Sequence, residues 1–438
     1  MIRKRNFIFI LSVFFGHFAL AQSYQPKPLS LSQAIEQGLA ANYNVQIAEY
    51  ELERAQVNRM RGSSERFPSI DFSINQSNRL SRDNSPVSFT DGTYTKNEIS
   101  GSLNTDWLIY GGNRVKIDND RLKQIEKQKA GDSRTTVERT IKLIIRSYYK
   151  SLIEQEKLRV IAEARLFAHE KRKKAQAEYE AERISRFDLN NYKNDLLKDS
   201  IKFTQQEKKY TQSLIKLKTV IGYNGNRQLR LTDKLNEESE KYMYDVLEEE
   251  MLQNNLQLQN EVLKIGLLDN ALLRKKASRK PTIKFKNSIS DELNTSKFGS
   301  EERENGGILD ISAQISLSYN IFDGGKYKND LQQSKMDRII ADRRVSDLEL
   351  KLKEQLQINL EEYHRQMEIL TMKKKLAENL SENLTIAEDR LQNGYSIYIE
   401  YRDARIDLLE AELDIIQTIY DMKMAEIEVV QLIGGLLS

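Results

Sequence analysis

The side chains that most often carry out catalysis or hold metals are scarce or badly spaced in this sequence. The chain contains no cysteine, which excludes thiol catalysis, thiolate metal sites and disulfide bonds. His169 and His364, the only histidines beyond residue 21, lie in helical patterns without the spacing of metal ligands. We find no glycine-rich phosphate loop, no nucleophile elbow and no triad that contains histidine. The sequence therefore predicts no catalytic residue, no metal site and no cofactor, and we expect a protein that is not an enzyme.

Carboxylates are abundant, and one pair is placed so that it could act together. Glu400 and Asp403 are three residues apart in a helical pattern, so they share one helix face. Such a pair could attract cations, or it could be an ordinary solvated face that pairs with Arg402 or Arg405. A hydrolase that uses two carboxylates is a weaker alternative, because nothing in the sequence places a pair in a cleft.

The charge balance argues against a nucleic-acid partner. The chain of 438 residues has 68 basic and 65 acidic side chains, and the excess lies in the basic run Arg3-Lys4-Arg5 near its start. Without that run the balance is 65 against 65, which leaves no basic footprint for a nucleic acid. The mean hydropathy of −0.63 excludes a bundle of transmembrane helices.

The first 21 residues have the pattern of a cleavable signal peptide. The basic run is followed by an apolar stretch from Phe7 to Leu20 and by the small-residue pattern Ala19-Leu20-Ala21. About 14 apolar residues are too few to span a bilayer as a helix, which needs roughly 20. We therefore predict that residues 1–21 direct export and are then removed.

An internal duplication organises the rest of the chain. Segments in the first half of one copy have a similar pattern to segments 213 residues later in the other copy. One example is Asn42-Tyr43-Asn44-Val45, which corresponds to Asn255-Leu256-Gln257-Leu258. Each copy starts with a helix that a proline ends, Pro68 or Pro281. We predict a first structural repeat over 22–222, a linker or equatorial region over 223–245 and a second repeat over 246–438. Each repeat continues with two strands, about 68–77 and 98–110 or about 281–290 and 308–322, and a long helix hairpin, 113–222 or 326–434.

The predicted strands alternate strictly between apolar and polar residues. In the second repeat, Leu309, Ile311 and Ile315 share one face, and Asp310, Ser312 and Ser316 share the other. Such strands suit a barrel with lipid outside and water inside, or a soluble sheet packed on helices. Four strands are too few to close a barrel alone, because bacterial barrels need at least about eight. The long helices, about 105 Å each for roughly 70 residues, indicate a rod.

Over essentially the whole chain beyond the signal peptide, these features together resemble the TolC-like outer-membrane efflux proteins. The resemblance rests on the duplicated order of elements, on Pro68 and Pro281, and on the glycine pairs Gly111-Gly112 and Gly324-Gly325 at the turns from strand to helix. It implies a membrane β-barrel plus an all-α coiled coil: a homotrimer with one 12-stranded barrel in outer-membrane lipid and a periplasmic α-helical tunnel. Such a protein is a passive exit duct for efflux or type I secretion. It works with a periplasmic adaptor and an inner-membrane pump of RND or ABC type.

The resemblance also implies roles for residues at the helix reversals. Glu400 and Asp403 align with acidic positions that line the entrance constriction, where a trimer would form two acidic rings. An adaptor would dock at the tips, with Ser185, Asp188, Gly394 and Tyr395 as candidate contacts. Both tips depart from the usual Gly-x-x-Ser or Gly-x-x-Thr pattern, so the identity of the adaptor is left open. The alternative is a periplasmic coiled-coil scaffold with a soluble sheet.

Overall fold

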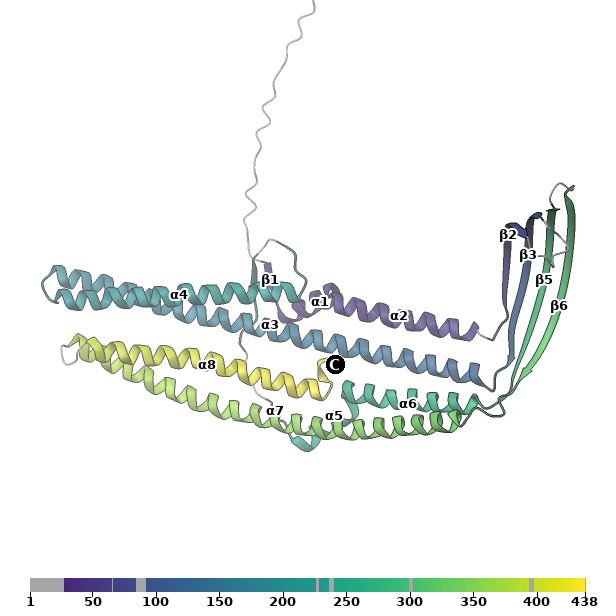
Figure 1. Cartoon of the computed structure of the whole chain (residues 1–438). Coiled ribbons are helices and arrows are strands. Elements are labelled where there is room, and N and C mark those ends of the chain that lie inside the picture. Colours follow the sequence, from purple (N-terminus) through teal and green to yellow (C-terminus); the bar gives the residue numbers. More distant parts are fainter. Residues whose placement is uncertain are drawn as a thin grey trace, which may run out of the picture.

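The computed structural model describes residues 27–64, 66–83, 92–225, 228–235, 240–298, 302–393 and 398–437. The predicted signal peptide, residues 1–21, lies outside these ranges. The described part is an elongated rod of helices with a four-stranded sheet at one end (Figure 1). None of the described helices is long and apolar enough to cross a membrane.

The elements follow the same order in the two halves of the chain. The first half contains β1 (Lys27–Leu29), α1 (Leu31–Ala41), α2 (Tyr43–Ser64), β2 (Ser69–Asp83), β3 (Gly92–Tyr110), α3 (Arg114–Glu180) and α4 (Arg186–Val220). The second half contains β4 (Leu229–Leu231), α5 (Tyr244–Asn254), α6 (Leu256–Ala277), β5 (Thr282–Phe298), β6 (Glu304–Ser318), α7 (Lys326–Gln392), α8 (Tyr398–Leu432) and the short 3-10 helix η1 (Gly435–Leu437).

The strands and the first helix of each half differ in detail from the sequence expectation. Strands β2 and β5 extend six and eight residues beyond the expected ends at 77 and 290. The single helix expected at the start of each half is divided in two, at Asn42 and at Asn255. The Asn42 side-chain oxygen accepts from the backbone N–H of Asn44 at 2.9 Å, and that of Asn255 accepts from Leu258 at 3.0 Å. Each asparagine therefore caps the following helix, which starts a new helix axis there.

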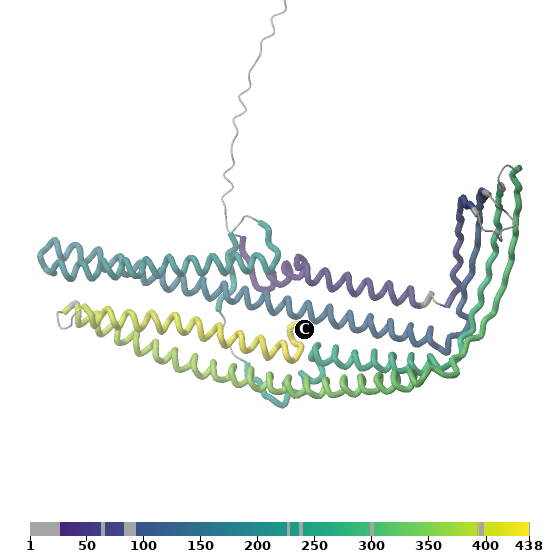
Figure 2. Tube along the Cα trace, viewed as in Figure 1, coloured from purple at the N-terminus to yellow at the C-terminus, as the bar shows by residue number. Residues whose placement is uncertain are grey.

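The helices form a single curved layer. Helices α3 and α7 have 67 residues each, which is about 100 Å at 1.5 Å per residue. Helices α2 and α4 lie end to end along α3, and α6 and α8 lie end to end along α7 (Figures 1 and 2). Across the layer, α3 packs against α6 and α8. One half of the chain thus contacts the other along the whole rod.

The largest cluster of buried apolar side chains among the described residues lies at the middle of the rod. There the short parallel strands β1 and β4 pair, and their leucines pack with Ile144, Leu152 and Leu217. The buried Tyr148 hydroxyl donates to the backbone carbonyl of Leu29 at 2.9 Å, which ties β1 to α3. Strands β1 and β4 therefore cover one face of the helix layer at the middle of the rod.

The sheet at the end of the rod is antiparallel throughout. Its strand order is β2-β3-β5-β6, so the two halves of the chain meet at the pairing of β3 with β5. The outer strands β2 and β6 have 15 residues each. Each of these strands has one neighbour in the described chain, which leaves its other edge unpaired.

Candidate functional site: the sheet faces and the helix tips

One face of the sheet is apolar and uncovered. The strand register places Phe72, Leu103, Ile289 and Ile311 in one row across the four strands. The two outer members of the row, Phe72 and Ile311, are 69% and 65% exposed. A continuous exposed apolar surface of this kind marks contact with lipid or with another protein.

The opposite face is polar and internally hydrogen-bonded. The hydroxyls of Ser73 and Ser102 lie 2.8 Å apart across β2 and β3, and the Ser288 hydroxyl donates to the side-chain oxygen of Asn104 at 2.7 Å. An ion pair of 3.2 Å joins Lys286 to Asp106. The predicted alternation therefore produces one face suited to lipid and one suited to water.

The glycine turns lie between the sheet and the long helices. Gly112 and Asn113 have left-handed φ angles of 66° and 70° just before α3, and Gly324 and Gly325 have 66° and 85° just before α7. A side chain at Gly112 would bring its Cβ within 2.8 Å of the Ala277 carbonyl oxygen. Gly111 does not have a left-handed φ, so the equivalent pair in the first half is Gly112-Asn113. Asparagine tolerates this conformation better than most residues with a Cβ.

The first helix tip is a capped turn between α3 and α4. The Ser185 hydroxyl accepts from the Asp188 backbone N–H at 3.1 Å, and the Asp188 carboxylate accepts from the Ser185 backbone N–H at 3.2 Å. This capping box fixes the start of α4 and stabilises the reversal. Phe187 beside it is 72% exposed, so the tip presents an aromatic ring at its surface.

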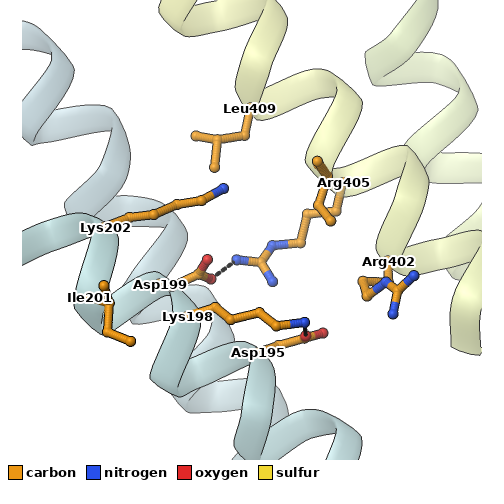
Figure 3. A pocket seen from close by; sticks show the side chains of 9 residues that line it. Asp195, Lys198, Asp199, Ile201, Lys202, Arg402, Arg405 and Leu409 are labelled. Carbon is orange, nitrogen blue, oxygen red and sulfur yellow. Dashed lines mark hydrogen bonds and ion pairs between the residues drawn. The ribbon is translucent and has the colours of Figure 1, made fainter.

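The second tip connects α7 to α8, and the candidate residues Gly394 and Tyr395 lie outside the described residues. The first turns of α8 bind directly to α4 of the other hairpin. The Tyr398 hydroxyl donates to the Asp195 carboxylate, and the Arg405 guanidinium pairs with Asp199. Figure 3 shows Arg405 reaching from α8 to Asp199 on α4.

The links between the two hairpins are shielded from water. The side chains of Arg405 and Asp199 are only 14% and 10% exposed, and Arg405 also donates to the Ala164 carbonyl of α3 at 3.1 Å. The Tyr192 and Tyr398 rings meet edge to face with centroids 4.3 Å apart. Burial, with the neighbouring carboxylates, raises the pKa of Tyr192 to about 12, and burial and the bond to Asp195 raise the pKa of Tyr398 further. Both phenols are therefore neutral at physiological pH.

The predicted acidic pair lies on the exposed surface of α8, close to these links. Glu400 and Asp403 are both exposed in the single chain. Asp403 accepts from the Arg402 guanidinium at 2.8 Å, which is one of the local pairings that the sequence left open. Arg405, the other expected partner, binds Asp199 instead.

Comparison with known proteins connects this geometry to a family. Residues 247–435, which cover nearly all of the second repeat, match the profile of the family described as Outer membrane efflux protein. The predicted resemblance to outer-membrane efflux proteins is confirmed. A comparison with curated protein sequences found no significant match.

Solved structures of outer-membrane and transmembrane channels share the fold of the whole rod and sheet. The Campylobacter jejuni CmeC outer membrane channel is 15% identical with a TM-score of 0.74, over 92% of this chain and 85% of that one. The open state of the Neisseria gonorrhoeae MtrE outer membrane channel is 13% identical with a TM-score of 0.73, over 93% and 89%. CusC is 14% identical with a TM-score of 0.74, over 92% of both chains. At these identities the likeness concerns the fold.

The sequence did not predict several of the residues that connect the two hairpins near their tips. Asp195, Asp199 and Tyr192 lie in an ordinary charged helix pattern on α4, about 200 residues before their partners on α8. Only the pairing of hairpins that are distant in sequence brings them together. The run Asp195-Leu196-Leu197-Lys198-Asp199, with two acids at i and i+4, was the one available signal.

Replacing Arg405 with alanine should loosen the contact between the two hairpins, because Asp199 would remain as a buried carboxylate without its counter-ion. Breaking a buried pair in this way costs about 3–5 kcal/mol. We expect faster amide hydrogen exchange in residues 186–200 of Arg405→Ala, measured by mass spectrometry.

Arg402→Ala is the matched control for this prediction. Its partner Asp403 is 57% exposed, and losing an exposed pair costs about 0–1 kcal/mol. Equal exchange in the two variants would show that the Arg405–Asp199 pair does not hold the hairpins together.

Proposed function

We propose that three copies of this chain form an outer-membrane duct that lets exported compounds pass passively, without catalysis by the chain itself. The observation that carries the proposal is the sheet at the end of the rod, with one exposed apolar face, one polar face and two unpaired edges. We further propose that residues 1–21 are a cleaved signal peptide and that the helices lie in the periplasm.

The unpaired edges are the reason for assembly. Peptide groups that face lipid without a hydrogen-bond partner cost several kcal/mol each, so a membrane sheet must close. The outer strands β2 and β6 have equal lengths of 15 residues and opposite directions, so β6 of one copy can pair with β2 of the next. Three copies of the four strands give twelve, above the minimum of about eight for a bacterial barrel.

The height of the apolar band suits the outer membrane. On β5 the face that carries the apolar side chains runs from Ile283 to Leu293 and also includes Asn287 and Asp291. Ten residues at about 3.4 Å span about 34 Å along the strand, or about 24 Å across a bilayer at a tilt of 45°. Lipid-facing bands of bacterial barrels are about 25 Å tall.

The helix layer supplies the periplasmic part of the duct. With four helices side by side in each copy, a closed trimer has twelve at every level. At a spacing of about 10 Å, twelve helices close into a ring about 38 Å across, which leaves a bore of about 25 Å inside. We propose that a periplasmic adaptor and an inner-membrane pump, of RND or ABC type, deliver cargo to the far end.

The assembly is tested by disulfide bonding across the proposed junction of β6 with β2. The chain has no cysteine, so introduced pairs are the only thiols. We expect Ile311→Cys, combined in turn with Ile70→Cys, Phe72→Cys or Ile74→Cys, to give covalent trimers on oxidation at the register that the closed barrel adopts. These trimers should be extracted from outer membranes by detergent and should add conductance to a planar bilayer.

Ile311→Cys combined with Ile47→Cys on α2 is the control and should stay monomeric on denaturing gels. A protein found in the soluble periplasmic fraction, or one that adds no conductance, would support the scaffold alternative and refute the duct.

We also propose that Glu400 and Asp403 form acidic rings at the periplasmic mouth. Carboxylate rings favour and bind cations, so millimolar calcium should lower the conductance of the wild-type channel. Glu400→Ala plus Asp403→Ala should remove this effect. Asp245→Ala plus Glu249→Ala removes two exposed carboxylates from α5, far from the tips, and should keep it. Calcium sensitivity that survives in the tip variant would refute the rings.

The proposed adaptor contact involves the candidate tip residues Ser185, Asp188, Gly394 and Tyr395. A photo-reactive amino acid in place of the exposed Phe187 should cross-link to an adaptor when the partners are expressed together. The same probe at Ile215, 58% exposed and about 42 Å further along α4, should not. Cross-linking to an adaptor only at Ile215 would place docking elsewhere on the rod.

A further inference from the structure

A groove rich in positive charge lies near the middle of the rod, away from the tips and the sheet. It has a volume of about 590 Å³ and runs between α4 and α8 over the surface of α3. Its cations are Arg146, Lys150 and Lys157 of α3 and Lys209 and Lys216 of α4. The single carboxylate that lines it belongs to Glu154.

The positive charge of this basic groove is only partly neutralised. Glu154 binds Lys150 at 2.8 Å and also accepts from the Gln206 amide at 2.6 Å. Lys157, Lys209 and Lys216 have no carboxylate within 4 Å among the residues that the structure describes. Three ammonium groups thus line one concave surface without a carboxylate in direct contact among the described residues, although Glu154 and Asp421 act on the charge of Lys157 from a greater distance.

Lys157 is the most enclosed of the three. Its ammonium group donates to the side-chain oxygen of Gln417 on α8 at 2.8 Å, a neutral partner. Burial lowers the pKa of Lys157, and the nearby charges of Lys150 and Lys209 lower it further against the opposing effects of Glu154 and Asp421. An anion bound in the groove would favour the charged form of this lysine.

The basic groove lies on the open face of the helix layer. Tyr148 binds the β1 carbonyl of Leu29, whereas Lys150, two residues later, lines the groove. Two residues turn an α-helix by about 200°, so the groove is opposite the face covered by β1 and β4. A bore of about 25 Å has little room for three copies of these added elements, so in a closed ring they lie outside and the groove inside.

The position of the basic groove argues against a lipid ligand. Lys150 is 36 residues from the start of α3 at Arg114, which is about 54 Å from the sheet end of the helix. Lipid headgroups would surround only the sheet. The ligand must therefore be water-soluble.

We propose that this basic groove is an anion-binding site on the inner wall of the duct, which takes the phosphate, sulfate or carboxylate groups of exported compounds. The proposal rests on the proposed function and names a cargo class for it. Ammonium groups at the end of flexible lysine stems suit multiply charged oxyanions of varied shape. Three copies would repeat the site around the bore.

Binding is tested first without reference to transport, by titration calorimetry of the purified full-length protein with inorganic triphosphate. We expect the variant Lys157→Gln plus Lys209→Gln plus Lys216→Gln to bind at least about tenfold more weakly than wild type, since each lost ionic contact contributes up to about tenfold in affinity. Lys157→Arg keeps the charge and should keep binding. Lys127→Gln plus Lys234→Gln plus Lys241→Gln removes three exposed lysines elsewhere and should bind like wild type. Equal binding by both triple variants, or no binding by wild type, overturns the site.

The second measurement places the site inside the duct. The reversal potential of the bilayer channel in a potassium chloride gradient should shift toward cations in the groove variant, with a chloride-to-potassium permeability ratio at least about twofold lower. An unchanged ratio, with triphosphate binding lost, assigns the site to the outer surface and overturns the cargo inference. Absence of any wild-type conductance refutes the duct, while the calorimetry still decides whether the groove binds anions.

Discussion

A strand edge without a neighbour would leave its peptide groups without hydrogen-bond partners in lipid, and the sheet of this protein has two unpaired edges among the described residues, on β2 and β6. A helix or loop could have covered them, but the described chain has neither at this end of the rod. The apolar face beside them is open as well, with Phe72 and Ile311 mostly exposed. One chain alone therefore cannot supply hydrogen-bond partners for both edges of its sheet. Other copies can, and the remaining features of the molecule follow from that requirement.

The helix layer, like the sheet, has surfaces that a single chain leaves uncovered. A single layer of helices has two faces and two lateral sides, and among the described residues β1, β4 and their neighbours cover one face at the middle of the rod. Closing three layers into a ring buries the lateral sides and creates an inner wall. In the proposed trimer the inner wall would be polar along the sheet, where Ser73, Ser102 and Asn104 form hydrogen bonds, and basic in the groove around Lys157. Charge along the rod thus varies with position, although the chain beyond the basic N-terminal run is balanced overall.

The far end of the rod depends on contacts between hairpins. Tyr398 with Asp195 and Arg405 with Asp199 join α8 to α4 through neutral phenol and buried ion-pair contacts. A buried ion pair contributes little net stability compared with an apolar contact, but it is costly to break on one side only. Such links hold one arrangement of the two hairpins in preference to others. They also leave Glu400 and Asp403 on the exposed surface of the same helix turns.

Local patterns in the sequence determined most of the elements. Strict alternation predicted the strands, Pro68 and Pro281 marked where helices end, and the repeat predicted the order of elements in both halves. These signals are local, since each depends on residues a few positions apart. The sequence pattern did not predict that the first helix of each half is divided at Asn42 and at Asn255. The apolar pattern continues through both positions, whereas the asparagine side chain caps a new helix there. Only the tertiary structure decided that Gly112-Asn113 is the left-handed pair, that α4 meets α8 through Asp195 and Asp199, and that three lysines share one groove. The contacts between α4 and α8 join residues up to 206 positions apart, and no periodicity within one helix specifies which distant helix will lie beside it.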